Sequence, residues 1–550
     1  MQSPQPTHHD VIIIGGGPQA LAVASRLREQ TPGALYTDTE HERLLWHVRH
    51  KKRAPNVQNI DPLAVHSESY PCAATPRELS ILVLDKGAGK WMHQWRRGFE
   101  ALEISHLRSP MFFHPDPSDP DALKAFALRE GREKELVEIE GVVSRMVSKH
   151  EQKKKRYVKR KPLGSNVNER DRCQYFTPSS TLFCDFCDEV IDRYNLANII
   201  QQGDVRDIQH TVHPATSESI FHVSLSDGRA STSRYVVLAL GAATIPNIPR
   251  PPIGEERCAM CHSSEVIARG FVVCPALQEK INRGEETCVA LVGGGLTSAQ
   301  IADVLLRKGV SHVYLICRGH LKVKHFDFPL TWLGKYKNLH HADFWSQQDP
   351  AARVAMIREA RNGGSITPAY HAILQSHRAA KRLTIKPHTT VADQTWCSAS
   401  RNWNIHLAPA TGPAKTICCD HVYWATGSTV SIGDLPFLAN FRAAHPIELC
   451  CGFPCITRDL QWRPDVPLFV VGGYAALEIG PAAFNLLGSR SGAERIVRRM
   501  GEMMEGGCDS CGVEETTLGA EGEDDGEWDG LEELRGGAGN WFEALGEIDA

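Results

Sequence analysis

The chain has 550 residues, of which 42% are hydrophobic and 23% charged, as in an ordinary soluble globular protein. This composition excludes a fibrous chain and a chain disordered throughout, and the length predicts two to four domains at roughly 100–200 residues each. The formal net charge of −4 hides an acidic end, because residues 505–550 hold 15 Asp and Glu against one Arg. The rest of the chain is mildly basic, which suits an anionic small-molecule partner and is too weak to indicate nucleic-acid binding.

No apolar run approaches the roughly 20 residues that cross a bilayer, and the first nine residues lack the pattern of a secretory signal. We therefore expect a cytoplasmic protein without a membrane partner, whose 17 cysteines are mostly reduced thiols. The segment 505–550 is acidic and rich in glycine, and we expect it to be a disordered tail.

The first element is an apolar run at residues 10–14, which predicts a strand buried on both faces. Glycines and then apolar residues at helical spacing follow, which indicates a strand, a glycine turn and a helix. In the pattern Gly15-x-Gly17-x-x-Ala20, the first glycine allows the tight turn and the second lets the backbone approach a pyrophosphate. The small third residue lets helix and strand pack closely. The free N–H groups of the helix N-terminus would then hold the pyrophosphate.

The second strand, at residues 80–85, ends in Asp85, where a carboxylate accepts hydrogen bonds from ribose hydroxyls. The usual distance from the glycine turn to this acidic residue is about 20 residues, whereas Gly17 and Asp85 are 68 positions apart. Residues from about 33 to 77 are therefore predicted to be an insertion.

A second unit of the same kind begins with a strand at residues 289–292, after a proline-rich linker. Its pattern is Gly293-x-Gly295-x-x-Ser298, which includes Thr297 and leads into a helix expected at residues 299–308. The next strand ends in Arg318, and an arginine at that position suits the 2′-phosphate of NADP. The first unit has an acidic residue at its strand end and the second has a basic one. This combination predicts FAD and NADPH as the two cofactors.

These motifs resemble those of the two-dinucleotide-binding flavoprotein superfamily, and within it class B flavin monooxygenases of the lysine/ornithine N-monooxygenase type. The matching segments are Gly15-Gly16-Gly17-Pro18 with Leu21, Gly293 to Ala299, Ala425-Thr426-Gly427, and His262-Ser263-Ser264-Glu265. By this match, Pro18 and Gly427 join the two sets of glycines as cofactor-binding residues.

The resemblance implies an α/β fold of two Rossmann-like dinucleotide-binding domains, with the NADPH domain inserted into a split FAD domain. The expected boundaries are 8–280 and 430–504 for the two parts of the FAD domain, and 285–429 for the NADPH domain. The implied activity is that of an FAD- and NADPH-dependent N-hydroxylating monooxygenase, which acts on a small molecule with O2 through a C4a-hydroperoxyflavin. No residue is assigned as a general acid or base, and we leave open the substrate and whether the protein forms a homo-oligomer.

The resemblance also gives roles to residues near the flavin and the substrate. The segment Leu102 to Arg108 is similar to the family's Q-x-S-F-L-K segment, which implies that Glu103 faces the flavin and that Arg108 binds an anionic group of the substrate. The family's asparagine segment for the substrate is not visible at residues 324–338.

Two further segments are each open to two interpretations. Trp91 lies in a region that covers the flavin in the family, where it either stacks on the isoalloxazine or is a core residue. Gly480-Pro481 starts a predicted helix, whose N-terminus either stabilises negative charge on the flavin or belongs to an ordinary packed helix.

Cys258 and Cys261 leave a different activity open. Their C-x-x-C spacing lies ahead of the second glycine turn, where some thioredoxin-reductase-like flavoproteins carry a redox dithiol. The alternatives to a monooxygenase are therefore a thiol or disulfide oxidoreductase that uses these cysteines, and a flavin-binding regulatory protein without turnover. Cys184-x-x-Cys187 lies in a helical pattern and is expected to be buried thiols, and we expect no metal site.

Overall fold

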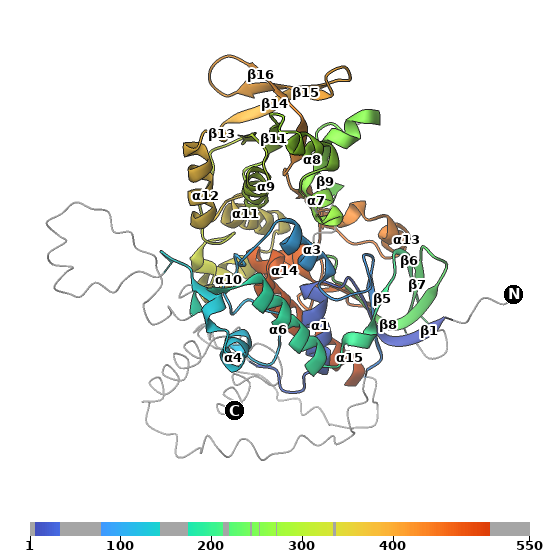
Figure 1. The fold of residues 1–550 in the computed structure, drawn as a ribbon. Helices are drawn as coiled ribbons and strands as arrows, with labels where there is room; N and C mark the ends of the chain where they lie inside the picture. The colour runs from blue at the N-terminus through green and yellow to red at the C-terminus, as the bar shows by residue number, and fades with distance from the viewer. Residues whose placement is uncertain are drawn as a thin grey trace, which may run out of the picture.

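The computed structural model describes residues 6–33, 79–142, 174–212, 219–241, 245–251, 254–270, 272–333 and 337–505. The insertion predicted at about residues 33–77 and the predicted tail lie outside these ranges, except for the boundary residues Gly33 and Glu505. Within the described ranges, no helix is long and apolar enough to cross a bilayer. Figure 1 shows two α/β units, one above the other.

The first unit is built on a sheet with a parallel core. Its strands lie in the order β5 (Ile200–Gln202), β2 (Ile81–Asp85), β1 (Thr7–Ile14), β8 (Ala230–Leu238) and β22 (Val466–Val470). Antiparallel strands extend this core through β21 (Gln461–Arg463), which pairs with β22, and through β7 (Ser219–Leu225), which pairs with β8 and with β6 (Val205–Val212). The last five residues of β1 are buried, as the apolar run predicts for a central parallel strand.

Two helices far apart in the sequence, α1 (Pro18–Arg28) and α15 (Leu486–Glu505), pack against each other in this unit. Its other helices are α3 (His93–Ala101), α4 (Ala122–Arg129), α6 (Ser180–Arg193), α13 (Ala439–Ala444) and α14 (Ala476–Ile479). Two short ribbons pair β3 (Leu136–Glu138) with β4 (Phe176–Pro178), and β19 (Leu449–Cys450) with β20 (Phe453–Pro454). The first turn of α6 is stabilised by Ser179, whose hydroxyl accepts a hydrogen bond from the N–H of Leu182.

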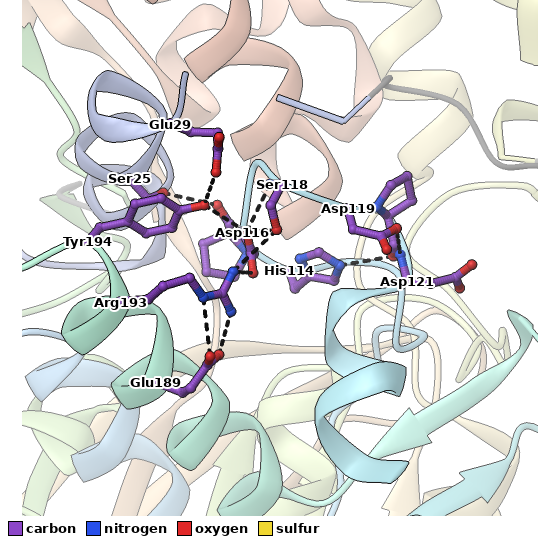
Figure 2. Close-up of polar contacts among 12 residues, drawn as sticks. Ser25, Glu29, His114, Asp116, Ser118, Asp119, Asp121, Glu189, Arg193 and Tyr194 are labelled. Atoms are coloured by element: carbon purple, nitrogen blue, oxygen red, sulfur yellow. Dashed lines mark hydrogen bonds and ion pairs between the residues drawn. The ribbon is translucent and has the colours of Figure 1, made fainter. Parts of the chain in front are cut away.

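A buried polar network ties the loop at residues 110–121 to α1 and α6 (Figure 2). Asp116 is fully buried, and its carboxylate accepts a hydrogen bond at 2.8 Å from Arg193, the last residue of α6. Tyr194 donates a hydrogen bond at 2.5 Å to Glu29, which directly follows α1. Because breaking one partner of a buried charge pair is strongly destabilising, this network fixes the path of the loop.

The second unit contains a five-stranded parallel sheet. Its order is β10 (Met260–His262), β17 (His421–Trp424), β11 (Cys288–Val292), β12 (His312–Ile316) and β13 (Leu383–Lys386). Its helices are α7 (Ser263–Arg269), α8 (Pro275–Asn282), α9 (Leu296–Arg307) and α12 (Pro368–Ala379), whereas the buried side chains of α10 (Lys337–Ser346) and α11 (Pro350–Arg361) join the core of the first unit. A three-stranded antiparallel sheet of β14 (Thr389–Cys397), β15 (Asn402–Pro409) and β16 (Lys415–Cys419) lies at its outer end (Figure 1).

The second unit is inserted into the first. β8 and β22 are neighbours in the first sheet, although the whole second sheet lies between them in the sequence. The two chain crossings, β9 (Ile245–Pro246) and β18 (Ser428–Thr429), pair with each other as a short antiparallel ribbon. This topology confirms the predicted fold class of one α/β unit inserted into another.

The change from one unit to the other comes earlier than the expected boundary at residue 280. β10 pairs with β17 in the second sheet, and the side chains of Val266, Val272 and Leu277 join the core of the second unit. Residues 260–280 therefore pack with the second unit, because their apolar side chains are buried there.

Candidate cofactor and substrate site

The first glycine turn leaves the N-terminus of α1 open. Gly15 has φ +119°, and a Cβ atom there would lie 2.3 Å from the carbonyl oxygen of Ala239, so only glycine fits. Gly17 is the N-cap of α1 without any side-chain cap, and a Cβ there would meet nothing within 4 Å. Pro18 is the first helical residue, and Ala20 is fully buried against the strand. The first N–H groups of α1 thus have no side-chain cap, as an anion site requires.

Asp85 lies at the carboxyl end of β2, beside this turn. Its Oδ2 accepts hydrogen bonds from the N–H groups of Ala88 at 2.9 Å and Gly89 at 3.2 Å, which fixes the loop after the strand. Its Oδ1 lies beside Gly16, where a Cβ atom would come within 3.1 Å of it. The position matches the predicted ribose contact, which stays a prediction.

Gln19 is a residue of this site that the sequence pattern did not indicate. Its side chain is buried, and Nε2 donates a hydrogen bond at 3.4 Å to the carbonyl oxygen of Asn485. Its Oε1 is buried without a hydrogen-bond partner in the structure. Because buried polar atoms are nearly always paired, an unpaired acceptor beside the open turn fits a hydroxyl-bearing ligand. The residues present therefore fit the ribityl and ribose hydroxyls of FAD.

The second glycine turn has the same construction. Gly293 has φ +152°, and a Cβ there would lie 2.3 Å from the carbonyl oxygen of Ala425. Gly295 is the N-cap of α9, again without a side-chain cap. Ser298 is fully buried, and its hydroxyl donates a hydrogen bond at 2.6 Å to the carbonyl oxygen of Gly295, while Thr297 is half-buried in the same turn. The second turn thus also presents an uncapped helix N-terminus suited to a phosphate.

Two more of the predicted residues lie around this second turn. Arg318 lies two residues after the end of β12 and is exposed, so its guanidinium is accessible to a ligand. Gly427 has φ +74° and open space where a Cβ would be, and its carbonyl oxygen accepts hydrogen bonds from His262 and from the N–H of Asn247, both at 3.0 Å. An accessible arginine at this strand end fits the 2′-phosphate of NADPH.

Arg108 is saturated by contacts within the protein. Its Nε donates to the carbonyl oxygen of His325 at 3.0 Å, and Nη1 donates to Oδ1 of Asp327 at 2.5 Å and to the carbonyl oxygen of Ser365 at 3.4 Å. Nη2 donates to the carbonyl oxygen of Lys324 at 3.0 Å and to the hydroxyl of Ser365 at 2.8 Å. A guanidinium has five N–H groups, so none is left for the substrate anion that the resemblance implies.

Arg361, the last residue of α11, lies on the other side of Asp327. Its Nη1 donates to the carbonyl oxygen of Pro481 and to Oδ1 of Asn485, both at 3.2 Å, and Nη2 lies 3.8 Å from Oδ2 of Asp327. Its guanidinium also lies 4.5 Å from the ring centre of Phe484. Burial lowers the pKa of Arg361, and Asp327 acts in the opposite direction.

These contacts form a continuous path between the two glycine turns, which we call the polar bridge: Gln19, Asn485, Arg361, Asp327, Arg108 and Ser365. At one end, Gln19 belongs to the first turn of α1. At the other end, Ser365 follows Gly364, where a Cβ atom would lie 3.0 Å from Cα of Gly295. The polar bridge therefore lies between the two predicted cofactor sites.

Trp91 is in the core. Its side chain is 7% exposed, and its indole N–H donates a hydrogen bond at 2.9 Å to the carbonyl oxygen of Leu196. Its one polar atom is thus paired inside the protein, which favours the core interpretation over stacking on the flavin.

Glu103 forms ion pairs with the C-terminal end of α9. Its carboxylate contacts Lys308 at 2.7 Å and also Arg307, and these two cations hold its pKa below the usual value. The glycine turn is at the other end of α9, about 17 Å away for a 12-residue helix. The Glu103 carboxylate therefore forms ion pairs between the two units, whereas the resemblance implies that it faces the flavin.

The helix expected to begin at Gly480-Pro481 starts later. Gly480, with φ +85°, ends α14, and Pro481 opens the four-residue 3-10 helix η10 (Pro481–Phe484). Asn485 is extended, with φ −119° and ψ 169°, and the long helix α15 begins only after it, at Leu486. The expectation of one helix from Pro481 onward is therefore wrong, because the chain turns twice before α15.

The candidate dithiol does not have the surroundings of a redox centre. Cys258 is exposed, whereas Cys261 is buried in β10, with Sγ 3.6 Å from Nε2 of His421. Burial raises the pKa of the Cys261 thiol to about 12, and the reactive form of a cysteine is the thiolate. Cys184 and Cys187 are both buried in α6, as expected.

Comparisons with known proteins agree with this architecture. Residues 173–430 match the family model of L-lysine 6-monooxygenase/L-ornithine 5-monooxygenase, which confirms the predicted resemblance. The fold is similar to that of the ornithine N-hydroxylase KtzI from Kutzneria sp. 744, at 15% sequence identity and a TM-score of 0.59 over 91% of this chain and 100% of that one. Among curated proteins, no match was found.

Two further solved structures show the same likeness. The ornithine hydroxylase PvdA from Pseudomonas aeruginosa is 17% identical, with a TM-score of 0.58 over 90% of this chain and 100% of that one. DfoA, the cadaverine monooxygenase of desferrioxamine biosynthesis from Erwinia amylovora, is 14% identical, with a TM-score of 0.57 over 90% of this chain and 94% of that one. The chain thus has the fold of these flavin-dependent enzymes.

Proposed function

From the match to lysine and ornithine monooxygenases, we propose that this protein is an FAD- and NADPH-dependent enzyme that hydroxylates a nitrogen atom of a small molecule. The observation that carries the proposal is the pair of open glycine turns joined by the polar bridge. Two nucleotide sites that face a common region are what electron transfer between two dinucleotides requires.

The residues of each turn have distinct tasks in this proposal. The N-terminus of α1 binds the FAD pyrophosphate, Asp85 binds a ribose hydroxyl and Gln19 Oε1 accepts from another hydroxyl. The N-terminus of α9 binds the NADPH pyrophosphate, and Arg318 binds its 2′-phosphate. When bound, FAD supplies the oxygen chemistry and NADPH the electrons.

The overall reaction converts an amine, O2, NADPH and a proton into a hydroxylamine, NADP+ and water. The chain itself contributes position and electrostatics: the hydrogen bonds and ion pairs of the polar bridge hold the two turns at a fixed separation. The proposal includes a cytoplasmic location, which the free thiols of the described cysteines support. Self-association stays a prediction.

The test uses the full-length protein loaded with FAD. The flavin is reduced with NADPH without oxygen, aerated buffer and an amine are then added, and hydroxylamine and hydrogen peroxide are both measured. We expect hydroxylamine that depends on NADPH, O2 and the amine together.

A matched pair of variants serves as control. Gly17→Val fills the open turn and should abolish flavin binding and product, whereas Gly501→Val, at an open position of α15, should retain both. The proposed function is refuted if NADPH reduces the flavin but the reaction with O2 gives only hydrogen peroxide, with every amine tried. Disulfide reduction lost in Cys258→Ser and Cys261→Ser would favour the thiol alternative.

A further inference from the structure

The carboxyl ends of β12 and β13 carry four basic side chains, which we call the basic corner. They are Arg318 and His320, which follow β12, and Lys386 and His388, at and just after the end of β13. We infer that the basic corner binds the 2′-phosphate of NADPH, and that its two histidines make the preference for NADPH over NADH depend on pH. This inference rests on the proposed function and adds three residues that set its coenzyme specificity.

Backbone hydrogen bonds hold the two segments of the basic corner side by side. The N–H of Cys317 donates to the carbonyl oxygen of Lys386 at 2.9 Å, and the N–H of His388 donates to the carbonyl oxygen of Gly319 at 3.3 Å. The imidazole rings of His320 and His388 lie 6.3 Å apart, centre to centre. These contacts bring the turn after β12 against the end of β13, so the four side chains start from the same corner of the sheet.

The protein does not neutralise the basic corner. Within the described residues, none of its four side chains forms a hydrogen bond or an ion pair. The stretches of sequence around it, residues 312–326, 381–392 and 403–419, contain no Asp or Glu. Like charges held close together repel each other, and an anion bound among them removes that repulsion. The basic corner therefore has the composition of an anion site.

The position of the basic corner beside the second glycine turn identifies the anion. The N–H of Gly293 donates to the carbonyl oxygen of Ile316 at 2.9 Å, so this turn and the end of β12 are adjacent. A dinucleotide with its pyrophosphate at the N-terminus of α9 places its adenosine ribose at the end of the next strand. That strand is β12, and β13 is its neighbour on the far side. The phosphate on this ribose is the group that distinguishes NADPH from NADH.

The two histidines make the attraction for this phosphate variable. Histidine changes its charge between pH 5 and 8, whereas arginine and lysine do not titrate in this range. The charged groups on the surrounding turns are Arg318, Lys322 and Lys386, and the strand ends beside them, residues 389–391 and 407–411, carry no charge. Protonation of the histidines thus adds positive charge to a site without an acid. Above about pH 6, where a phosphate monoester holds its second negative charge, the preference for NADPH should weaken as the pH rises.

The first test measures binding without turnover. With the FAD-loaded full-length protein, the Kd values of NADP+ and NAD+ are measured by calorimetry at pH 6.5 and pH 8.5, and their ratio isolates the 2′-phosphate. We expect the preference for NADP+ to fall about two- to tenfold between these pH values, the worth of exposed ion pairs. In His320→Asn combined with His388→Asn, the preference should be weaker at pH 6.5 and should no longer fall with pH. Asparagine tolerates the left-handed backbone of His388, with φ +49°.

Two single variants serve as controls. Lys386→Gln should weaken the preference for NADP+ by a similar factor at both pH values, because lysine does not titrate between them. His222→Asn replaces an exposed histidine of β7 in the first unit, and it should leave the preference and its pH dependence unchanged.

The outcomes separate the two proposals. If no amine is hydroxylated, but NADP+ is preferred in a pH-dependent way that the double histidine variant loses, the proposed function fails and the inference stands. If amines are hydroxylated with NADPH, but the double variant has the same preference as wild type at both pH values, the inference is overturned and the proposed function stands. Absence of NADP+ binding to the FAD-loaded protein would overturn both.

Discussion

Alanine at Gly15 and at Gly17 should separate two roles of the first glycine turn. At Gly15, φ is +119° and the new Cβ would lie 2.3 Å from a backbone oxygen of Ala239. The backbone conformation costs a non-glycine residue about 1–2 kcal/mol, and overpacking adds about 1–3 kcal/mol. We therefore expect Gly15→Ala to lower the free energy of unfolding by about 2–5 kcal/mol.

Gly17 should behave differently in the protein without FAD. Its φ is −90° and the new Cβ would meet nothing within 4 Å, so alanine fits the folded backbone. Alanine reduces the freedom of the unfolded chain, which stabilises by about 0.4–1 kcal/mol, but it is a poorer N-cap than glycine by a similar amount, so Gly17→Ala should be about as stable as wild type. The added methyl group lies where the pyrophosphate approaches, and it should weaken FAD binding by about tenfold or more.

The two variants are compared by chemical denaturation without FAD and by titration of FAD through the quenching of its fluorescence. A Gly15→Ala protein as stable as wild type would show that the contact with Ala239 does not constrain the turn. Normal FAD affinity in Gly17→Ala would show that the N-terminus of α1 is not the pyrophosphate site.

Three further predictions concern single features. Arg318→Ala should raise KM for NADPH about 10- to 100-fold and leave KM for NADH unchanged, because only NADPH carries the 2′-phosphate; an equal rise for both would remove Arg318 from that site. Cys258→Ser combined with Cys261→Ser should leave amine-dependent NADPH oxidation unchanged, because the Cys261 thiol is buried; lost oxidation would contradict this. Burial lowers the pKa of His421 from 6.5 to about 3, so the unfolded chain binds a proton that the folded chain excludes. Stability should therefore fall as the pH drops from 6.5 towards 3, and Tm scans of His421→Gln should show a smaller decline; an equal decline would refute the assignment.

The glycine turns were predictable because their signals are local. Each one consists of an apolar strand, closely spaced glycines and a helix, and the structure places them as expected. The resemblance to flavin monooxygenases rests on the same short segments and is confirmed by the family match. Local patterns could therefore identify the fold class and the ends of both candidate cofactor sites.

The centre of the site was not predictable, because its contacts join residues far apart in the sequence. Arg108 meets Asp327 219 positions later, and Gln19 meets Asn485 466 positions later. A motif match could place Arg108 at a substrate site, but only the fold shows that its donors are already occupied. The unit boundary was missed for a related reason, since β10 has three residues and joins the second sheet through β17.

The paired crossings β9 and β18 have a consequence beyond holding the two units together. Because the chain enters and leaves the second unit at adjacent points, that unit can be cut out or exchanged without reconnecting distant ends. The interval from residue 247 to residue 427 also carries Phe344, Val354 and Ile357, which are buried in the core of the first unit, so a graft between related proteins must match that core as well.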